Sequence, residues 1–366
     1  MKKWVAEGRL SGSLAIRPSC DAKEKHTARS RPAIPKHVQN LLLLKQLENS
    51  RVFPTDIKNG VSRAAPTLSP VPRRKTGRAC GKIILSGNTA NRFGRRALAV
   101  PVDMHITAEW EQARATADTL RVLWPGHNED GLWRVTVRKI LRLIEARIGP
   151  LAGTVTIRST LPLGKGMGSS TAIVIALARC FLGQNCKDEA RAIEDVVNKG
   201  HSGLDFAAIW EERPVVVQND RYEFTEVPEG LRRGFLIDTG LPVAPTPVIV
   251  ARLKKRLPKQ KALMDSVQTI GNCTERLLSG ENPLTVFPDH YYGQVHLGVV
   301  PARVRWLIEK IQQSGGAAKA ARFGGARGGA GMLFAIHPKT EVLKQIVGGE
   351  AISLIYDSSR HCFIKA

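Results

Sequence analysis

The sequence predicts an α+β protein built from two packed lobes. Strand-like segments come first, a group of helices follows, and strand-like segments return towards the carboxyl end, an order typical of this class. The 366 residues are enough for two or three domains with substantial cores. With 43% hydrophobic and 24% charged residues, the composition is that of an ordinary soluble globular protein.

Residues 1–77 differ from the rest and are predicted to form a basic extension without a packed core. They carry 16 of the 55 Lys and Arg residues but only 5 of the 32 Asp and Glu residues, and prolines interrupt them repeatedly. A targeting peptide, a start site assigned too far upstream and a nucleic-acid-binding arm all remain open, although Glu7, Asp21 and Glu24 argue against targeting. The net charge of +23 favours polyanions, including nonspecific nucleic acid, without selecting among them.

The remaining composition narrows the class of protein further. No apolar run reaches the roughly 18–20 residues that a membrane-spanning helix needs, so no membrane span is expected. The six cysteines show neither C-x-x-C pairs nor metal-ligand spacing, which argues against a disulfide framework. Reduced thiols favour a cytoplasmic protein. A homodimer is left open.

Ordered structure is predicted to begin near Cys80 and to divide into lobes 78–230 and 231–366. In the first lobe, β-branched or alternating apolar residues predict strands at 81–87, 97–110, 153–160, 214–218 and 222–227. Apolar residues at helical spacing predict helices within 124–148, from the end of the loop 162–171 to Gly183, and at 188–199. In the second lobe we expect a buried strand at 234–240, helices at 248–256, 261–278 and 302–313, and a glycine-rich turn with an apolar strand at 321–336.

The stretch Pro162–Thr171 (PLGKGMGSST) is the clearest candidate for a ligand site. Its alternating glycines, Gly164, Gly166 and Gly168, can adopt positive φ and allow a ligand to approach the backbone closely. A following helix presents free N–H groups and a dipole that favour anions, and its first residues are Ser169, Ser170 and Thr171. The spacing fits neither a Walker A loop nor a dinucleotide fingerprint. Because a lone glycine-rich turn is more often structural, the phosphate hypothesis needs support from other segments.

That support comes from the order of several segments, which resembles the GHMP small-molecule kinases and, within them, the mevalonate kinases. Cys80–Gly94 (CGKIILSGNTANRFG) is similar to the first motif of the family, P-G-K-x-x-L-x-G-E-H-x-x-x-x-G. Pro162–Thr171 matches the second, P-x-G-x-G-L-G-S-S-A, almost throughout, and Gly324–Ala330 partly matches the third. Ser202–Asp205 corresponds to the P-S-G-x-D segment, with Glu194 eleven residues before the aspartate. The resemblance covers about residues 79–340.

The resemblance implies a two-lobed α+β fold with the active site between the lobes, and it implies ATP and Mg²⁺ as cofactors. It assigns catalysis to Asp205, which would orient or deprotonate the acceptor hydroxyl, and to Lys82, which would support its charge. It assigns Mg²⁺ to Ser170 and Glu194. The positions that would hold ATP are Pro162, Gly164, Lys165, Gly166, Met167, Gly168, Ser169, Ser170 and Thr171. Acceptor contacts would come from Asn88, Thr89, Ser202, Gly325, Ala326 and Arg327.

The sequence departs from the family on the acceptor side. Asn88 and Thr89 stand where the family has an acidic residue and a histidine, and Arg327 replaces a glycine of the third motif. The expected reaction is phosphorylation of mevalonate to 5-phosphomevalonate, a step towards isoprenoid precursors. Because of the departures, a different acceptor (a sugar, homoserine or a phosphomevalonate-like compound) and a noncatalytic protein that binds a nucleotide or small ligand remain alternatives.

Overall fold

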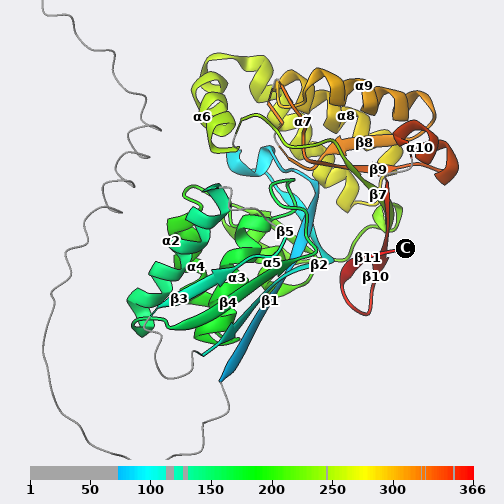
Figure 1. Ribbon diagram of the computed structural model, residues 1–366. Coiled ribbons are helices and arrows are strands. Elements are labelled where there is room, and N and C mark those ends of the chain that lie inside the picture. Colours follow the sequence, from blue (N-terminus) through cyan, green and yellow to red (C-terminus); the bar gives the residue numbers. More distant parts are fainter. Residues whose placement is uncertain are drawn as a thin grey trace, which may run out of the picture. The chain divides into compact units, whose positions relative to one another are not determined.

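A mixed β-sheet runs through the described part of the chain and carries two groups of helices, which confirms the α+β class (Figure 1). The computed structural model describes residues 73–112, 119–126, 131–244, 246–322, 324–325, 327–348 and 351–366. These residues fall within one unit, Ser69–Ala366. The predicted extension lies outside the described residues as far as residue 72. Strand β1 already begins at Arg74, so the predicted start of order near Cys80 is too late.

The first lobe places its strands against helices α2–α5 (Figure 1). Its elements are β1 (Arg74–Ser86), η1 (Ala90–Phe93), β2 (Ala97–Glu111), β3 (Leu120–Leu123), α2 (Gly131–Ile148), β4 (Gly153–Ser159), α3 (Ser169–Leu182), α4 (Lys187–Val197), α5 (Leu204–Glu211), β5 (Val215–Gln218) and β6 (Arg221–Phe224). Helix α3, the apolar helix after the loop, packs on β1 and β2. The predicted strands and helices of this half are confirmed within a few residues, except that β1 begins well before the predicted Gly81, whereas β3 and α5 are additions.

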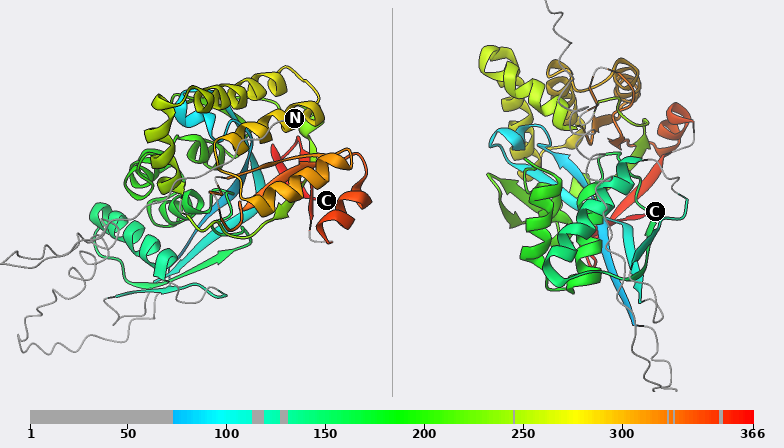
Figure 2. Two further views of the ribbon diagram at one scale, coloured as in Figure 1. Left: turned by 90° about the horizontal axis from the view of Figure 1, so that it is seen from above. Right: turned by 60° about the vertical axis from the view of Figure 1, so that its left-hand side comes forward.

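The second lobe contains the remaining helices, which lie above those of the first lobe in Figure 1 and in the right-hand view of Figure 2. Its elements are η2 (Glu229–Leu231), β7 (Arg233–Asp238), α6 (Thr246–Arg256), η3 (Leu257–Lys259), α7 (Lys261–Leu278), α8 (Pro283–His296), α9 (Ala302–Gln313), β8 (Ala317–Ala320), β9 (Met332–Ile336), α10 (Thr340–Val347), β10 (Ile352–Asp357) and β11 (Cys362–Lys365). The helices predicted at 261–278 and 302–313 are confirmed with the same bounds.

The strand order shows how the lobes are joined. Along the sheet it runs β3-β4-β2-β11-β10-β7-β9-β8, and both β1 and β5 also pair with β2. The carboxyl-terminal hairpin β10–β11 therefore stands between the strands of the two lobes, with Phe363 of β11 opposite Val102 of β2. The sheet consequently crosses the predicted division at 230/231.

Helix α8 is absent from the predicted elements because Pro288 lies inside it, and an internal proline usually interrupts a helix. The residues at the start of the helix favour helix formation despite this internal proline. Asn282 caps the helix by accepting a hydrogen bond from the Leu284 N–H at 3.0 Å, and Pro283 occupies the first turn, where its missing N–H costs nothing. The helix then packs on α7 and β8.

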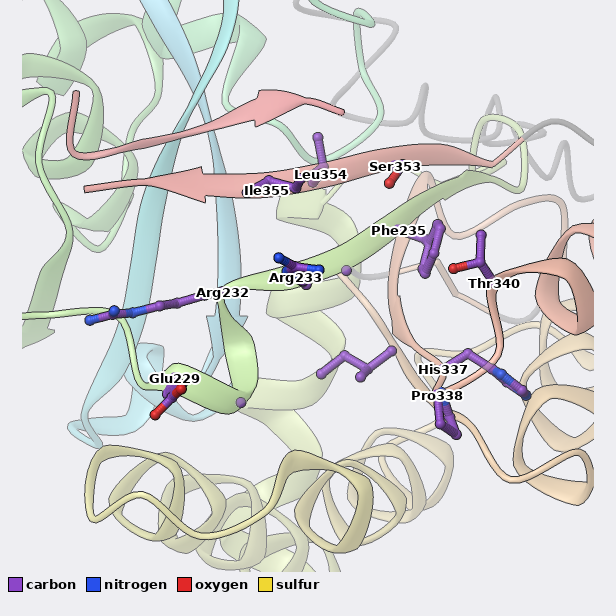
Figure 3. Close-up of a pocket in the computed structure, with 13 residues that line it drawn as sticks. Glu229, Arg232, Arg233, Phe235, His337, Pro338, Thr340, Ser353, Leu354 and Ile355 are labelled. Carbon is purple, nitrogen blue, oxygen red and sulfur yellow. The ribbon is translucent and has the colours of Figure 1, made fainter. Parts of the chain in front are cut away.

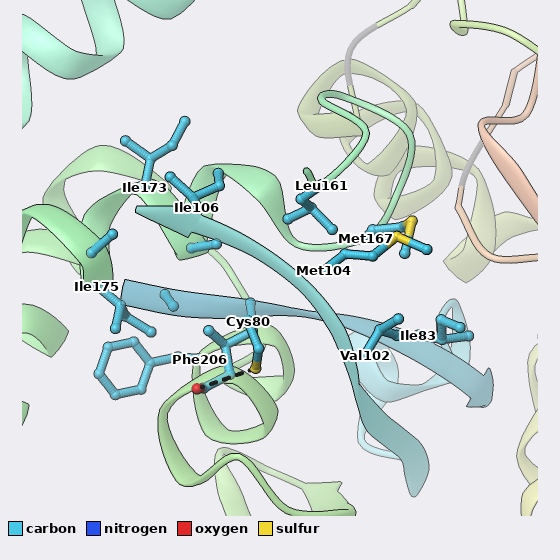
Figure 4. Packing of buried hydrophobic residues seen from close by; sticks show 14 of the residues in the cluster. Cys80, Ile83, Val102, Met104, Ile106, Leu161, Met167, Ile173, Ile175 and Phe206 are labelled. Carbon is cyan, nitrogen blue, oxygen red and sulfur yellow. Dashed lines mark hydrogen bonds between the residues drawn. The ribbon is translucent and has the colours of Figure 1, made fainter. Parts of the chain in front are cut away.

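A buried hydrophobic cluster lies directly under the glycine-rich loop (Figure 4). Met167 of the loop is fully buried and lies beside Met104 of β2 and Leu161, which precedes the loop. Burying a methionine side chain contributes about 1.5–3 kcal/mol. Met167 therefore anchors the middle of an otherwise polar loop to the core.

Candidate active site

The loop 162–171 connects β4 to α3 and takes a backbone path that requires glycine. Gly164, Gly166 and Gly168 have φ values of +70°, +89° and +77°. A Cβ at position 166 would stand 2.7 Å from the Cβ of Arg322, so side chains are excluded there by contact as well as by conformation. The glycines therefore alternate in the sequence because every second residue of the loop has a left-handed backbone conformation.

Four consecutive carbonyl groups of the loop, those of residues 164–167, accept hydrogen bonds from protein donors. The oxygens of Gly164 and Lys165 accept hydrogen bonds from the Arg322 guanidinium and the Met332 N–H, and those of Gly166 and Met167 accept them from the Nζ and the N–H of Lys82. Among the described residues, the N–H groups of residues 165–168 have no hydrogen-bond partner. The first N–H groups of α3 also have no intrahelical partner. A run of free N–H groups at a helix start is a favourable place for an anion.

Lys82 links this loop to the predicted catalytic carboxylate. Its Nζ lies 2.9 Å from the Gly166 oxygen and 3.0 Å from Oδ1 of Asp205, and only 2% of the residue is exposed. The pairing of β1 with β2 is interrupted immediately before Lys82, because Asp103 and Met104 of β2 are extra residues between the partners of Cys80 and Gly81. The sequence pattern predicted both residues, and the structure brings them together.

Asp205 lies in the first turn of α5, after Gly203 with φ +70°. Its side chain is 39% exposed, so one face of the carboxylate is open beside the buried lysine. A carboxylate in the first turn of a helix is stabilised by the helix dipole. Asp205 therefore presents an accessible carboxylate, paired with Lys82, next to the glycine-rich loop.

Glu194 of α4 is only 1% exposed and accepts two hydrogen bonds, one from the start of α3 and one from the end of its own helix. Its Oε1 accepts from the Thr171 hydroxyl at 2.7 Å, and its Oε2 accepts from the Asn198 amide at 2.8 Å. Ser170 donates to Oδ1 of the same amide at 2.8 Å, so it reaches Glu194 through Asn198. Burial raises the pKa of Glu194, and the two hydrogen bonds oppose that shift.

These donors suit a magnesium ion, because Mg²⁺ takes hard oxygen ligands and commonly needs only one or two from the protein. A cation beside Glu194 would offset the burial of its charge, which the hydrogen bonds only partly do. No group of three or more His, Cys, Asp or Glu side chains that could hold a metal occurs among the residues that the structure describes. The arrangement therefore fits an ion shared with a phosphate ligand better than one caged by protein.

Two of the predicted acceptor residues are buried. Asn88 is 5% exposed. Its amide donates a 3.4 Å hydrogen bond to the carbonyl of Ala320 and accepts one of the same length from the Gln294 amide of α8. Thr89 is fully buried, and its hydroxyl has no hydrogen-bond partner in the described residues. Asn88 thus joins β8 and α8 of the second lobe to the first motif.

The other predicted acceptor residues are more dispersed. Ser202 is half-buried just before α5, while Arg327 is exposed. Gly325 has φ +71° and faces Ile249 of α6. Ala326 lies outside the described residues. The third motif mainly braces the chain after β7, since Thr239 and Leu241 share backbone hydrogen bonds with residues 329–331.

Sequence reasoning missed several basic residues around the site because each stands alone, outside any motif. Arg322 donates hydrogen bonds to the Gly164 carbonyl of the loop and, at 3.2 Å, to the Thr246 hydroxyl. Burial lowers the pKa of its guanidinium. Lys319 is fully buried in β8 and donates to the Ile84 carbonyl at 2.5 Å. Burial and the nearby charge of Lys82 lower the pKa of Lys319 to about 7. Its only sequence signal is a charge inside the apolar strand AAKA.

A separate hollow of about 620 Å³ lies in the second lobe (Figure 3). Strands β7 and β10 and the segment before α10 line it, with Arg232, Arg233, His337 and Ser353 among the polar side chains. None of the predicted site residues lines it. Arg232 stacks over Tyr356 and donates to the Val227 carbonyl, so part of the polar lining serves the fold.

No described helix is long and apolar enough to cross a membrane.

Comparisons with known proteins agree on one family. Residues 135–210 match the family model described as the GHMP kinases N terminal domain. No curated protein matches the chain by sequence.

Solved structures of three different kinases share the fold. The mevalonate kinase of Methanococcus jannaschii has a TM-score of 0.59 at 16% identity, over 77% of this chain and 97% of its own. The Streptococcus pneumoniae phosphomevalonate kinase in complex with phosphomevalonate and AMPPNP has a TM-score of 0.57 at 18% identity, over 75% and 96%. The Lactococcus lactis galactokinase complexed with galactose has a TM-score of 0.57 at 13% identity, over 77% and 92%. At such identities the likeness establishes the fold and leaves the acceptor open.

Proposed function

Since the chain carries a GHMP kinase N-terminal domain and has the fold of GHMP kinases, we propose that it transfers the γ-phosphoryl group of ATP to a hydroxyl of a small metabolite. The observation that carries this proposal is the position of Lys82. Its ammonium group touches both the anion-binding loop, at the Gly166 oxygen, and the carboxylate of Asp205. A phosphate donor and a hydroxyl acceptor held by these two neighbours would meet at the lysine.

The donor side of the site is the loop 164–171. Its carbonyls are held by Lys82, Met332 and Arg322, so its N–H groups stay fixed in the opposite direction without a ligand to order them. Such preorganised donors stabilise the charge of a transferring phosphoryl group more than flexible ones, because they need no reorganisation during the reaction. Phosphoryl transfer depends mainly on this positioning and neutralisation.

On the acceptor side, Asp205 accepts the proton of the attacking hydroxyl. The hydroxyl oxygen forms a bond to the γ-phosphorus, the bond from that phosphorus to the bridging oxygen breaks, and ADP leaves with the electron pair. Lys82, 3.0 Å from Asp205, stays close to the negative charge that develops. Bringing both reactants into this geometry supplies a large part of the rate enhancement.

Glu194 and the hydroxyl groups of Ser170 and Thr171 would hold Mg²⁺. Bound there, Mg²⁺ neutralises charge on the phosphate oxygens. Asn198 keeps the Glu194 carboxylate oriented towards the start of α3.

Mevalonate is the acceptor we expect, in line with the sequence motifs. Mevalonate and phosphomevalonate kinases both share the fold, and so does a galactokinase, so phosphomevalonate, a sugar and homoserine are the alternatives to test. Asn88 and Arg327, which depart from the family pattern, are the features that favour a noncatalytic ligand-binding role instead.

The decisive experiment measures ADP release with ATP and Mg²⁺ over a panel of these acceptors, for the full chain and for Asp205→Asn. Loss of the general base should lower the acceptor-dependent rate by about 10²- to 10⁴-fold. Asp188→Asn is the matched control, because Asp188 is also an exposed carboxylate in the first turn of a helix, α4, outside the site. Equal turnover in Asp205→Asn and Asp188→Asn would disprove the mechanism.

A further inference from the structure

Three arginines lie at the end of the first motif, Arg92 within it and Arg95 and Arg96 directly after it, and they differ in what surrounds them. Arg96 forms ion pairs with two carboxylates, those of Glu223 and Glu275. Arg95 is exposed. Arg92, on η1, is half-buried, and no ion pair to it occurs within the described residues. Its one hydrogen bond runs from NH1 to the carbonyl of Gly200 at 2.6 Å.

Arg92 lies on the acceptor side of the site. Gly200 precedes the Ser202–Asp205 segment, so the hydrogen bond fixes the guanidinium beside the start of α5. Burial lowers the pKa of Arg92, and the carboxylate of Asp205 is the charge close enough to raise it. Asp205 forms its 3.0 Å ion pair with Lys82, and within the described residues no ion pair or hydrogen bond joins Asp205 to Arg92.

The Arg92 guanidinium has no carboxylate partner among the described residues. None of its nitrogens is a fully buried side-chain atom without a partner there, so its remaining N–H donors face space that water or a ligand can reach. Two other half-buried arginines of this lobe are compensated. Arg179 pairs with Glu212 at 2.7 Å, and Arg191 pairs with Asp220 at 2.7 Å. The Nε and NH2 donors of Arg92, which have no protein partner among the described residues, are therefore available to an anion that arrives with a ligand.

We propose that Arg92 binds an anionic group of the acceptor, a carboxylate or a phosphate, and so selects negatively charged hydroxyl compounds over neutral ones. This inference rests on the proposed kinase function, with the acceptor hydroxyl at Asp205. The guanidinium fork matches two oxygens of either anion, which fixes the orientation of the acceptor as well as its charge. A site that depends on this contact would disfavour neutral sugars among the alternative substrates.

The test compares the full-length wild type with Arg92→Gln, Arg92→Lys and the control Arg95→Gln. Acceptors are mevalonate, 5-phosphomevalonate, galactose and the neutral triol obtained by reducing the carboxylate of mevalonate to a hydroxymethyl group. For the preferred anionic acceptor, Arg92→Gln should lower kcat/KM by about 10- to 100-fold, the usual effect of losing hydrogen bonds to a charged group. Activity with the triol and the KM for ATP should stay unchanged. Mevalonate and phosphomevalonate distinguish a carboxylate from a phosphate.

Arg92→Lys keeps the charge but loses the fork, so an intermediate loss of kcat/KM is expected, and this variant serves if the glutamine variant does not fold. Equal kcat/KM for the anionic acceptor in Arg92→Gln and Arg95→Gln would overturn the inference. A wild type that phosphorylates galactose or the triol but neither anionic compound would also overturn it, although the kinase function would stand.

Calorimetric titration of the four proteins with the same compounds separates the two proposals. If the wild type phosphorylates nothing but binds mevalonate or phosphomevalonate, and Arg92→Gln does not, the inference holds and the proposed kinase function fails. If the wild type binds neither anionic compound and phosphorylates neither, the inference is wrong.

Discussion

Replacing Gly168 with alanine tests whether the loop and Lys82 act as one unit. Gly168 has φ +77° and ψ 19°, a left-handed conformation that costs a non-glycine residue about 1–2 kcal/mol. Its Cβ would stand 2.7 Å from Cδ1 of Ile209 and 3.2 Å from Cε of Lys82. Because Lys82 is buried between the loop and Asp205, relief of the contact must move the lysine or the loop away from the other.

Gly348→Ala is a matched control, since Gly348 has φ 69° and ψ 28° but no atom within 4 Å of the position that an added Cβ would occupy. Both variants should lose about 1–2 kcal/mol of unfolding free energy from the conformation, and Gly168→Ala should lose more because of the contacts. A displacement of catalytic groups by about 1 Å can cost about 10²-fold in rate. We therefore expect kcat/KM to fall by that order in Gly168→Ala and to stay near wild type in Gly348→Ala. The measurements are urea unfolding and coupled ADP release, and wild-type kinetics in Gly168→Ala would refute the reasoning.

Two further predictions concern buried charges. Glu194→Gln should raise the Mg²⁺ concentration needed for half-maximal activity by at least about tenfold. The control is Glu189→Gln, since Glu189 is an exposed residue of the same helix. An equal Mg²⁺ requirement in the two variants would contradict the magnesium assignment. Lys319 has a pKa lowered to about 7 from 10.5, so between these values the unfolded chain binds more protons than the native one and stability rises with pH. Lys319→Met should remove this rise, which has a limiting slope of about 1.4 kcal/mol per pH unit, when urea unfolding is measured from pH 7 to pH 9. An unaltered slope in that variant would show that Lys319 is not its source.

Local patterns predicted the elements around the site well. The path from β4 through the loop into α3 follows from a strand-like run, three glycines and an apolar helix, each of which is specified by neighbouring residues. Helix α5 was not predicted because G-H-S-G-L-D is typical of a turn, and its buried residues, among them Phe206 and Ile209, show no polar face that would mark a helix. The hairpin β10–β11 lies beside β2 because β11 pairs with β2, a strand more than 250 residues earlier in the chain. A pairing between such distant segments leaves no signal in the local sequence pattern.

The same contrast applies to the site. Residues of the motifs, such as Lys82, Asp205 and Glu194, could be found because their spacing is shared by a family. Arg322 and Arg92 could not, since their significance depends on contacts with Gly164 and Gly200, far away in the sequence. Lone basic residues in a chain with 55 lysines and arginines give no signal of their own.

The hydrogen bonds of the loop also show that both lobes shape the proposed phosphate site. Lys82 of β1 holds the carbonyls of residues 166 and 167, whereas Arg322 and Met332 of the second lobe hold those of residues 164 and 165. Lys165 adds an ion pair with Asp238 at the end of β7. The direction of the loop N–H groups therefore depends on how the lobes are packed. A change in lobe packing that released the two carbonyls held by the second lobe would turn the adjoining loop N–H groups away from the proposed phosphate position and leave the pair of Lys82 and Asp205 intact.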